Sequence, residues 1–106
     1  MQVFAAMSPE LPLTHVPAYA RRIERRGFDG LHIAETTHDS LAVALLAAEH
    51  TERLTIRTAV TLAFVRSPML TAYAAWDLQT FSGGRFELGL GTQIRQNIED
   101  RFGMPW

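Results

Sequence analysis

The stretch SGGRFELGLGTQ, residues Ser82–Gln93, decides the fold of this chain because apolar residues alternate in it with small or polar ones. Successive side chains of a strand point to opposite faces of the sheet. One face here is apolar and holds Phe86, Leu88 and Leu90. The other face holds Glu87, Gly89 and Gly91. Open parallel sheets are usually covered by apolar contacts on both faces. The asymmetry therefore predicts a closed barrel, with helices outside and small or polar groups inside.

The glycines of this stretch match neither of two common phosphate-binding motifs. A dinucleotide fingerprint needs G-x-G-x-x-G, but Gly89-x-Gly91 is followed by Ile94 at the third position. A P-loop needs Gly-Lys-Ser/Thr, and the chain has no lysine. Gly83-Gly84 is predicted to end a helix. Gly89 and Gly91 leave room for a flat ligand or relieve crowding inside the barrel, and one glycine can do both.

Strand and helix patterns alternate along the chain. The predicted strands are residues 2–7, 28–35, 54–60 and 85–91, and the predicted helices are residues 15–27, 41–50 and 68–82. This β-α-β-α-β-α-β order indicates an α/β fold with a parallel sheet and right-handed crossovers. A (βα)8 TIM barrel needs eight strands and roughly 250 residues. Residues 1–106 are therefore predicted to be a single partial domain, the N-terminal half of such a barrel with about four βα units.

Composition and charge exclude several other classes of protein. The chain is 47% hydrophobic and 20% charged, which is typical of a globular domain. A formal net charge of -1 gives no electrostatic basis for nucleic-acid binding. There is no cysteine, no signal-peptide pattern and no long apolar run, so we expect a cytoplasmic protein that does not enter a membrane. Histidines and acidic residues lack ligand spacing, so no metal site is expected.

Several short motifs occur in a fixed order: Gly27-Phe28-Asp29, Ala48-Glu49-His50-Thr51, Asp77-Leu78 with Ser82-Gly83-Gly84-Arg85, and Gly89-Leu90-Gly91-Thr92. Together they resemble the N-terminal half of the bacterial-luciferase-like flavin and deazaflavin oxidoreductases. The ending GTQ…RFGMPW is most similar to a branch that uses coenzyme F420. The resemblance implies a (βα)8 barrel with the flavin-type ring at the C-terminal ends of the strands. It also implies hydride transfer between F420 and a small-molecule substrate.

Two other functions stay open at this point. One is an FMN-dependent monooxygenase, which the same family contains. The other is an inactive half barrel that acts only in association, because a family enzyme also needs residues from its later strands.

The resemblance assigns candidate catalytic residues to the end of the second strand. Members of the family often have an acidic residue followed directly by His. Here Thr36 follows Glu35, and the nearest histidine is His38. Glu35 is a candidate for binding a cofactor or substrate hydroxyl, and His38 is a candidate acid or base that titrates near neutrality. The alternative for His38 is an ordinary solvent-facing loop residue, whereas His32 is expected on the interior face.

The resemblance also assigns cofactor contacts to the third and fourth strands. Related proteins often have a non-prolyl cis peptide behind the ring, and spacing back from Ser67-Pro68 places it at Ala59-Val60. The predicted cofactor-binding residues are Ala59, Val60, Thr61, Gly91, Thr92 and Gln93. Arg85 precedes the fourth strand, so it is expected at the opposite end of the barrel in a structural role.

The second and third helices are apolar beyond one stripe. Such helices are either buried beneath later segments of the chain or form a subunit interface. We expect a homo-oligomer through these helices, with Leu46 and Ala47 facing the partner.

Overall fold

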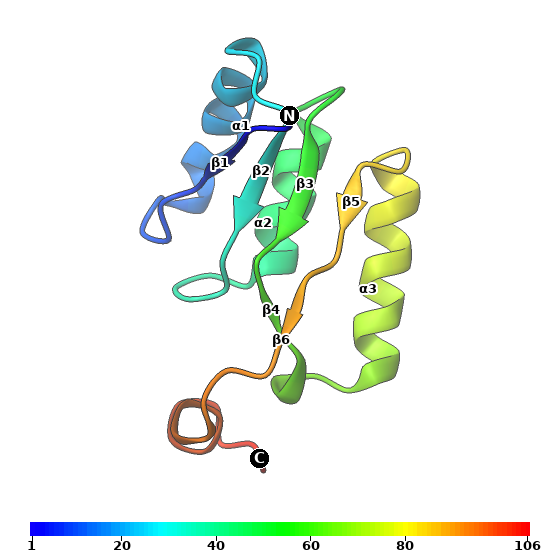
Figure 1. Ribbon diagram of the computed structural model, residues 1–106. Helices are drawn as coiled ribbons and strands as arrows, with labels where there is room; N and C mark the ends of the chain where they lie inside the picture. The colour runs from blue at the N-terminus through cyan, green and yellow to red at the C-terminus, as the bar shows by residue number, and fades with distance from the viewer.

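The computed structural model describes all of residues 1–106 and contains a parallel sheet covered by three helices (Figure 1). The main sheet has the order β1-β2-β3-β5, with bounds Phe4–Ala6, Gly30–Ile33, Thr55–Thr58 and Phe86–Glu87. A second, two-stranded sheet pairs β4 with β6, at Thr61–Leu62 and Leu90–Gly91. The helices are α1, α2 and α3, at Val16–Arg25, Ser40–Glu49 and Pro68–Phe81. Short helical turns lie at Leu13–His15, Ala63–Val65 and Asn97–Arg101.

Each helix connects two parallel strands, as the sequence predicts. In Figure 1, α1 and α2 lie behind the sheet and α3 runs beside β5. All neighbouring strands of both sheets are parallel. None of the helices combines the length and the apolar character needed to span a bilayer.

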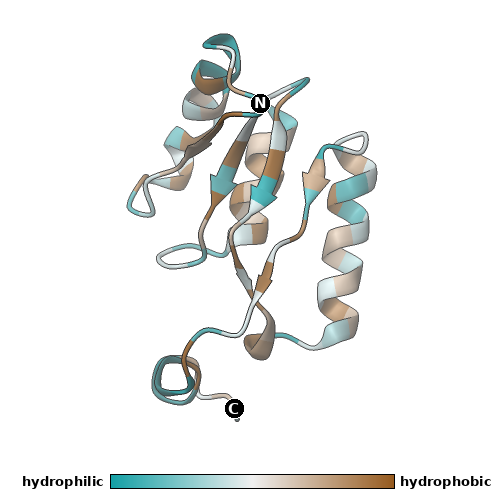
Figure 2. Ribbon diagram, in the orientation of Figure 1, coloured by the Kyte–Doolittle hydropathy of each residue, from teal (hydrophilic) through white to brown (hydrophobic).

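The core lies between the sheet and the helices, and the brown segments of Figure 2 mark the apolar residues that form much of it. From the sheet, Leu31, Ile33 and Ile56 are fully buried. From α2, Ala44 and Ala47 are equally buried, so the small residues of this helix allow it to lie close to the strands. Ala47 therefore cannot face a partner subunit, and that part of the sequence prediction is wrong.

The third and fourth predicted strands are each broken into two, which corrects the continuous strands predicted at 54–60 and 85–91. Thr58 explains the break physically. Its hydroxyl accepts a hydrogen bond from the amide of Gly89 at 3.0 Å and donates one to the carbonyl of Gly89 at 3.1 Å. A side chain thus replaces the strand ladder at this point. Beyond the break Leu90 is 52% exposed, whereas Phe86 before it is buried.

The interior face of the sheet is polar, as predicted. His32, Arg57 and Glu87 lie side by side in the register of β2, β3 and β5. The Arg57 guanidinium donates to Glu87 at 2.6 Å and lies 3.1 Å from His32 Nε2. It also lies 4.0 Å from the centroid of the Phe4 ring. His32 is therefore a half-buried partner of an ion pair on the interior face.

Arg85 holds the N-terminal end of the sheet together, which confirms its predicted structural role. Its guanidinium donates to the Thr51 hydroxyl and to the carbonyls of Ala48, Thr51, Leu54 and Ser82, at 2.8–3.1 Å. These groups belong to the end of α2, the loop that precedes β3, and the end of α3. The positive charge also lies where the dipoles of both helices are negative.

Glu24, at the end of α1, contributes a second fixed charge at this end. Its carboxylate accepts from the successive amides of Glu52, Arg53 and Leu54, the last two at 2.7 and 2.8 Å. Burial opposes ionisation of Glu24, but these donors outweigh it and lower its pKa below the ordinary value.

Candidate functional site

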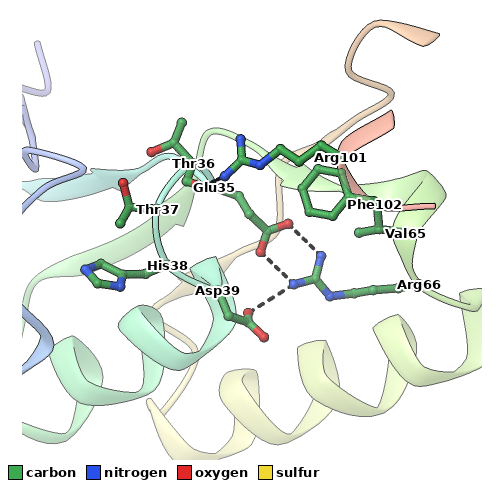
Figure 3. Close-up of a pocket in the computed structure, with 9 residues that line it drawn as sticks. All are labelled: Glu35, Thr36, Thr37, His38, Asp39, Val65, Arg66, Arg101 and Phe102. Carbon is green, nitrogen blue, oxygen red and sulfur yellow. Dashed lines mark hydrogen bonds and ion pairs between the residues drawn. The ribbon is translucent and has the colours of Figure 1, made fainter. Parts of the chain in front are cut away.

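A cavity of about 270 Å³ lies at the C-terminal end of the strands (Figure 3). Three segments line it: residues 35–39 of the loop between β2 and α2, Val65 and Arg66 after β4, and Arg101 and Phe102 near the end of the chain. The structure thus brings the two predicted catalytic residues, Glu35 and His38, to one cavity. The C-terminal ends of parallel strands are where (βα)8 barrels bind their ligands.

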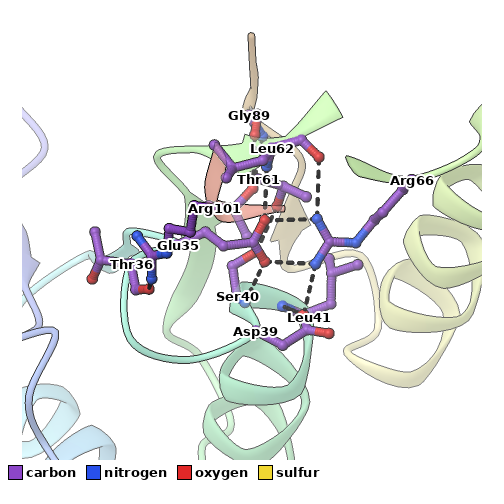
Figure 4. Close-up of polar contacts among 11 residues, drawn as sticks. Glu35, Thr36, Asp39, Ser40, Leu41, Thr61, Leu62, Arg66, Gly89 and Arg101 are labelled. Atoms are coloured by element: carbon purple, nitrogen blue, oxygen red, sulfur yellow. Dashed lines mark hydrogen bonds and ion pairs between the residues drawn. The ribbon is translucent and has the colours of Figure 1, made fainter. Parts of the chain in front are cut away.

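Glu35 forms the most densely bonded group of this site (Figure 4). Its carboxylate accepts two hydrogen bonds from the Arg66 guanidinium, both at 2.6 Å. It also accepts from the amide of Leu62 at 2.8 Å and from the amide and hydroxyl of Ser40 at 2.8 and 2.9 Å. The Ser40 hydroxyl uses its proton on Glu35, so it accepts from the hydroxyl of Thr61 at 2.9 Å. Glu35 therefore links β2, the start of α2 and β4.

This environment keeps Glu35 ionised. Burial opposes the charged form, but the Arg66 guanidinium and the amides of Leu62 and Ser40 outweigh it and lower the pKa of Glu35 to about 2. The same pairing raises the pKa of Arg66. Glu35 has no proton to donate at neutral pH, and its side chain is 7% exposed. The geometry favours a structural role for Glu35 over the predicted catalytic one.

His38 is half-buried in the wall of the cavity. Its Nε2 lies 2.9 Å from the carbonyl of Leu11, so Nε2 donates and carries a proton. The remaining nitrogen, Nδ1, is an acceptor in the neutral ring. The contact with Leu11 fixes the ring against the loop that precedes α1. His38 is therefore more ordered than the solvent-facing loop residue that the sequence left as its alternative, and its catalytic use stays a prediction.

The predicted cis peptide is present at Ala59-Val60. Both residues are exposed, and Val60 is 37% exposed despite its apolar side chain. A Cβ on Gly91 would collide with the Val60 side chain, and one on Gly89 would collide with the carbonyl oxygen of Thr58. Both glycines therefore relieve crowding within the protein, which was one of the two sequence interpretations. Gly91 stays a predicted cofactor contact.

The other predicted cofactor contacts differ in their exposure. Thr61 is 0% exposed and its hydroxyl is bonded to Ser40, so it presents no free surface for the predicted cofactor contact. Thr92 is exposed at the end of β6. Gln93 has a positive φ of 60°, and its side-chain oxygen accepts from the amide of Ile94 at 3.0 Å. Thr92 and Gln93 remain predicted contacts.

Sequence reasoning missed the residues that complete the cavity. Arg66 lies 31 positions from Glu35, and Arg101 lies 65 positions from Thr36, to whose carbonyl it donates. No local pattern reveals such distant pairs. The one available signal was Arg66 itself, a charged residue in the otherwise apolar stretch AFVRSP directly after the third predicted strand.

Comparison with known proteins identifies the family that these features resemble. The family model described as luciferase-like monooxygenase matches residues 1–106. An uncharacterised protein of Mycobacterium tuberculosis (strain H37Rv) is 58% identical over 84 residues, which are 79% of this chain and 25% of that protein. The 5,10-methylenetetrahydromethanopterin reductase of Methanolobus tindarius is 31% identical over 92% of this chain and 30% of the enzyme. The chain spans about a quarter to a third of these relatives.

Solved structures show the same fold. The coenzyme F420-dependent tetrahydromethanopterin reductase of Methanopyrus kandleri superposes with a TM-score of 0.85 at 24% identity, over 99% of this chain and 30% of that one. The oxygenating constituent of 3,6-diketocamphane monooxygenase from Pseudomonas putida, in complex with FMN, superposes with a TM-score of 0.82 at 18% identity, over 99% and 33%. The prediction of a half barrel is confirmed by these matches to one part of longer barrels.

Proposed function

Because the chain belongs to the luciferase-like monooxygenase family, we propose that it is the N-terminal part of an oxidoreductase that transfers hydride between coenzyme F420 and a small-molecule substrate. The observation that carries this proposal is the exposed Ala59-Val60 segment at the same end of the sheet as the cavity. An exposed apolar surface beside a polar cavity suits a flat ring with a polar substrate next to it. The relative that is 31% identical, 5,10-methylenetetrahydromethanopterin reductase, supports a reductase function.

Coenzyme F420 supplies the ring that carries the hydride, and the protein supplies position and polarity. Val60 and Ala59 would hold one face of the bound ring. Gly91 leaves the space that the Val60 side chain needs, and Thr92, exposed after β6, would hydrogen-bond a polar edge of the ring. His38 Nδ1 accepts or returns a proton at the substrate.

Glu35 and Arg66 act behind this surface as positioning residues. Glu35 holds the amide of Leu62 and, through Ser40, the hydroxyl of Thr61. These two residues directly follow Val60 in the chain. The buried ion pair therefore fixes the segment from which Val60 projects.

Two alternatives remain. The structural match to an FMN complex supports an FMN-dependent monooxygenase. An inactive half barrel that acts only in association is the other alternative.

Titration of the protein expressed from its complete reading frame, with F420 and with FMN, distinguishes the three functions. We expect tight binding of F420 and weak binding of FMN. The change Val60→Ser should weaken F420 binding several-fold, and Val3→Ser, at another exposed valine before β1, should have no effect. Tight FMN binding with oxygen consumption would support the monooxygenase instead. Binding of neither coenzyme would support the inactive half barrel.

A further inference from the structure

The cavity at the C-terminal end has two sides that differ in how their polar groups are paired. On one side, Arg66 bonds both Glu35 and Asp39, at 2.6 and 3.0 Å. The Asp39 carboxylate also accepts from the amide of Leu41 at 2.9 Å. On the other side lie Thr36, Thr37 and Arg101, and Figures 3 and 4 both place the Arg101 guanidinium next to Thr36 and away from Asp39.

Arg101 has no carboxylate within ion-pair distance. Its guanidinium donates a hydrogen bond to the carbonyl of Thr36 and lies 5.2 Å from the centroid of the Phe102 ring. A guanidinium has five N–H donors, so most of them are free to bind a ligand. The two contacts hold the charge at the cavity wall without neutralising it.

Thr36 and Thr37 line the same cavity as Arg101, and both are exposed, with no hydrogen bond from their hydroxyls to another protein group. Hydroxyl donors next to a fixed guanidinium are the groups that bind a carboxylate or phosphate oxygen. On the other side of the cavity, Arg66 already pairs with Glu35 and Asp39, so it competes little with Arg101 for an anionic ligand. A volume of about 270 Å³ limits the ligand to a small molecule.

We propose that Arg101, together with the Thr36 and Thr37 hydroxyls, binds an oxyanion of the substrate, and that this oxyanion is a carboxylate. The guanidinium forms paired hydrogen bonds with the two carboxylate oxygens. The apolar part of the molecule lies against Phe102 and Val65. This inference rests on the proposed function and deepens it, because it assigns a substrate class to the cavity at the same end of the sheet as Val60.

Benzoate and its neutral amide, benzamide, are the probes that test it. Calorimetric titration of the protein from its complete reading frame, without coenzyme, should show that benzoate binds and benzamide binds much more weakly. The change Arg101→Met should weaken benzoate binding about ten-fold or more, as expected for the loss of a charge-assisted pair. Arg101→Lys should restore part of the affinity. Arg95→Met, just before the same turn but paired with Glu99 and 70% exposed, should leave it unchanged.

Arg101 also contacts Thr36, so Arg101→Met could weaken binding by disturbing the local structure. A second variant tests the site without removing this contact. Thr37→Val preserves shape and removes one hydroxyl, and it should weaken benzoate binding by a smaller factor while the midpoint of thermal unfolding stays the same. Equal binding of benzoate and benzamide, or unchanged benzoate binding in both variants, would overturn the proposal.

Titration with F420 separates this inference from the proposed function and from the coenzyme as the source of the oxyanion. We expect F420 affinity to be unchanged in Arg101→Met. Loss of F420 affinity with benzoate binding intact would assign Arg101 to the acidic tail of the coenzyme and overturn the substrate assignment. If wild-type protein binds benzoate but not F420, the proposed function fails and the carboxylate site stands.

Discussion

The charged residues at the two ends of the sheet differ in how completely their side chains are hydrogen-bonded. At the N-terminal end, Arg85 bonds backbone groups of three segments, and Glu24 bonds three consecutive amides of one segment. At the C-terminal end, Glu35 and Arg66 bond each other and nearby backbone groups, but Arg101 keeps free donors at a cavity. The hydrogen bonds between β3 and β5 are regular near the N-terminal end and are interrupted at Gly89 towards the C-terminal end. Only the C-terminal end therefore holds a charge that is free to bind a ligand, and this is the end at which (βα)8 barrels bind their ligands.

The largest expected effect comes from removing the central charge of the N-terminal end. Arg85→Met leaves four carbonyls of the helix ends and loops without their donor, so we expect the free energy of unfolding to fall by about 3 kcal/mol. Urea denaturation measures it. Arg21→Met, at an exposed position of α1, is the matched control and should change little. A similar small effect in both variants would show that the end of the sheet does not depend on Arg85.

A smaller loss of stability is expected from a substitution at Gly89, where the hydrogen bonding between the strands is interrupted. Gly89→Ala places a methyl group against the carbonyl oxygen of Thr58, which is backbone and cannot rotate away, so we expect a loss of about 2 kcal/mol. Gly91→Ala, two residues further on, meets the side chain of Val60 instead. It should cost less stability and weaken F420 binding more, because Val60 must move. If the two variants behave alike in urea denaturation and F420 titration, the distinction between these glycines fails.

The pH dependence of stability tests the ion pair of the C-terminal end. The pKa of Glu35 is about 2 in the folded protein, against an ordinary value of 4.5, so the folded state binds this proton less readily. The stabilisation is therefore complete above pH 4.5 and is lost as the pH falls towards 2. Glu35→Gln should lower stability at neutral pH and flatten the profile in that interval. Glu10→Gln, at an exposed position, should leave the profile unchanged. A steep acid profile that survives in Glu35→Gln would assign the titration to other groups, Glu24 first among them.

The sequence predicted the order of elements and both faces of the sheet because these depend on local periodicity. Alternation in FELGL predicted a polar interior, and Arg57 and Glu87 occupy it. The same periodicity could not locate the break at Gly89, because the cause is the side chain of Thr58, which lies 31 positions away. Local pattern therefore predicts faces of strands but not where a distant side chain replaces the ladder.

The candidate site was predicted only in part, for the same reason. Glu35 and His38 follow one strand directly, so their place at its C-terminal end could be derived. Their roles could not, because the partners that decide them, Arg66 and Leu11, are distant in sequence. Arg101 depends on the path of the chain after β6, for which periodicity gives no rule. The orientation of α2 was equally undetermined, since a helix that is apolar on all sides does not show which residues face the sheet.

A substitution on the outer helices should have the smallest effect on stability and on F420 binding. A groove between α2 and α3 is lined mainly by apolar residues, among them Leu45 at 47% and Phe81 at 55% exposed. Monomeric proteins seldom leave such patches uncovered, so we propose that a second copy of the protein packs there. Leu45→Glu should shift the population towards monomer in light scattering across a concentration series. Because Leu45 contacts neither Arg85 nor the cavity, F420 affinity and the free energy of unfolding of the monomer should stay close to wild type.

Ala47→Glu on the same helix should instead unfold the protein, because Ala47 is 0% exposed. If Leu45→Glu leaves the scattering of wild type unchanged, the groove is not the contact between copies.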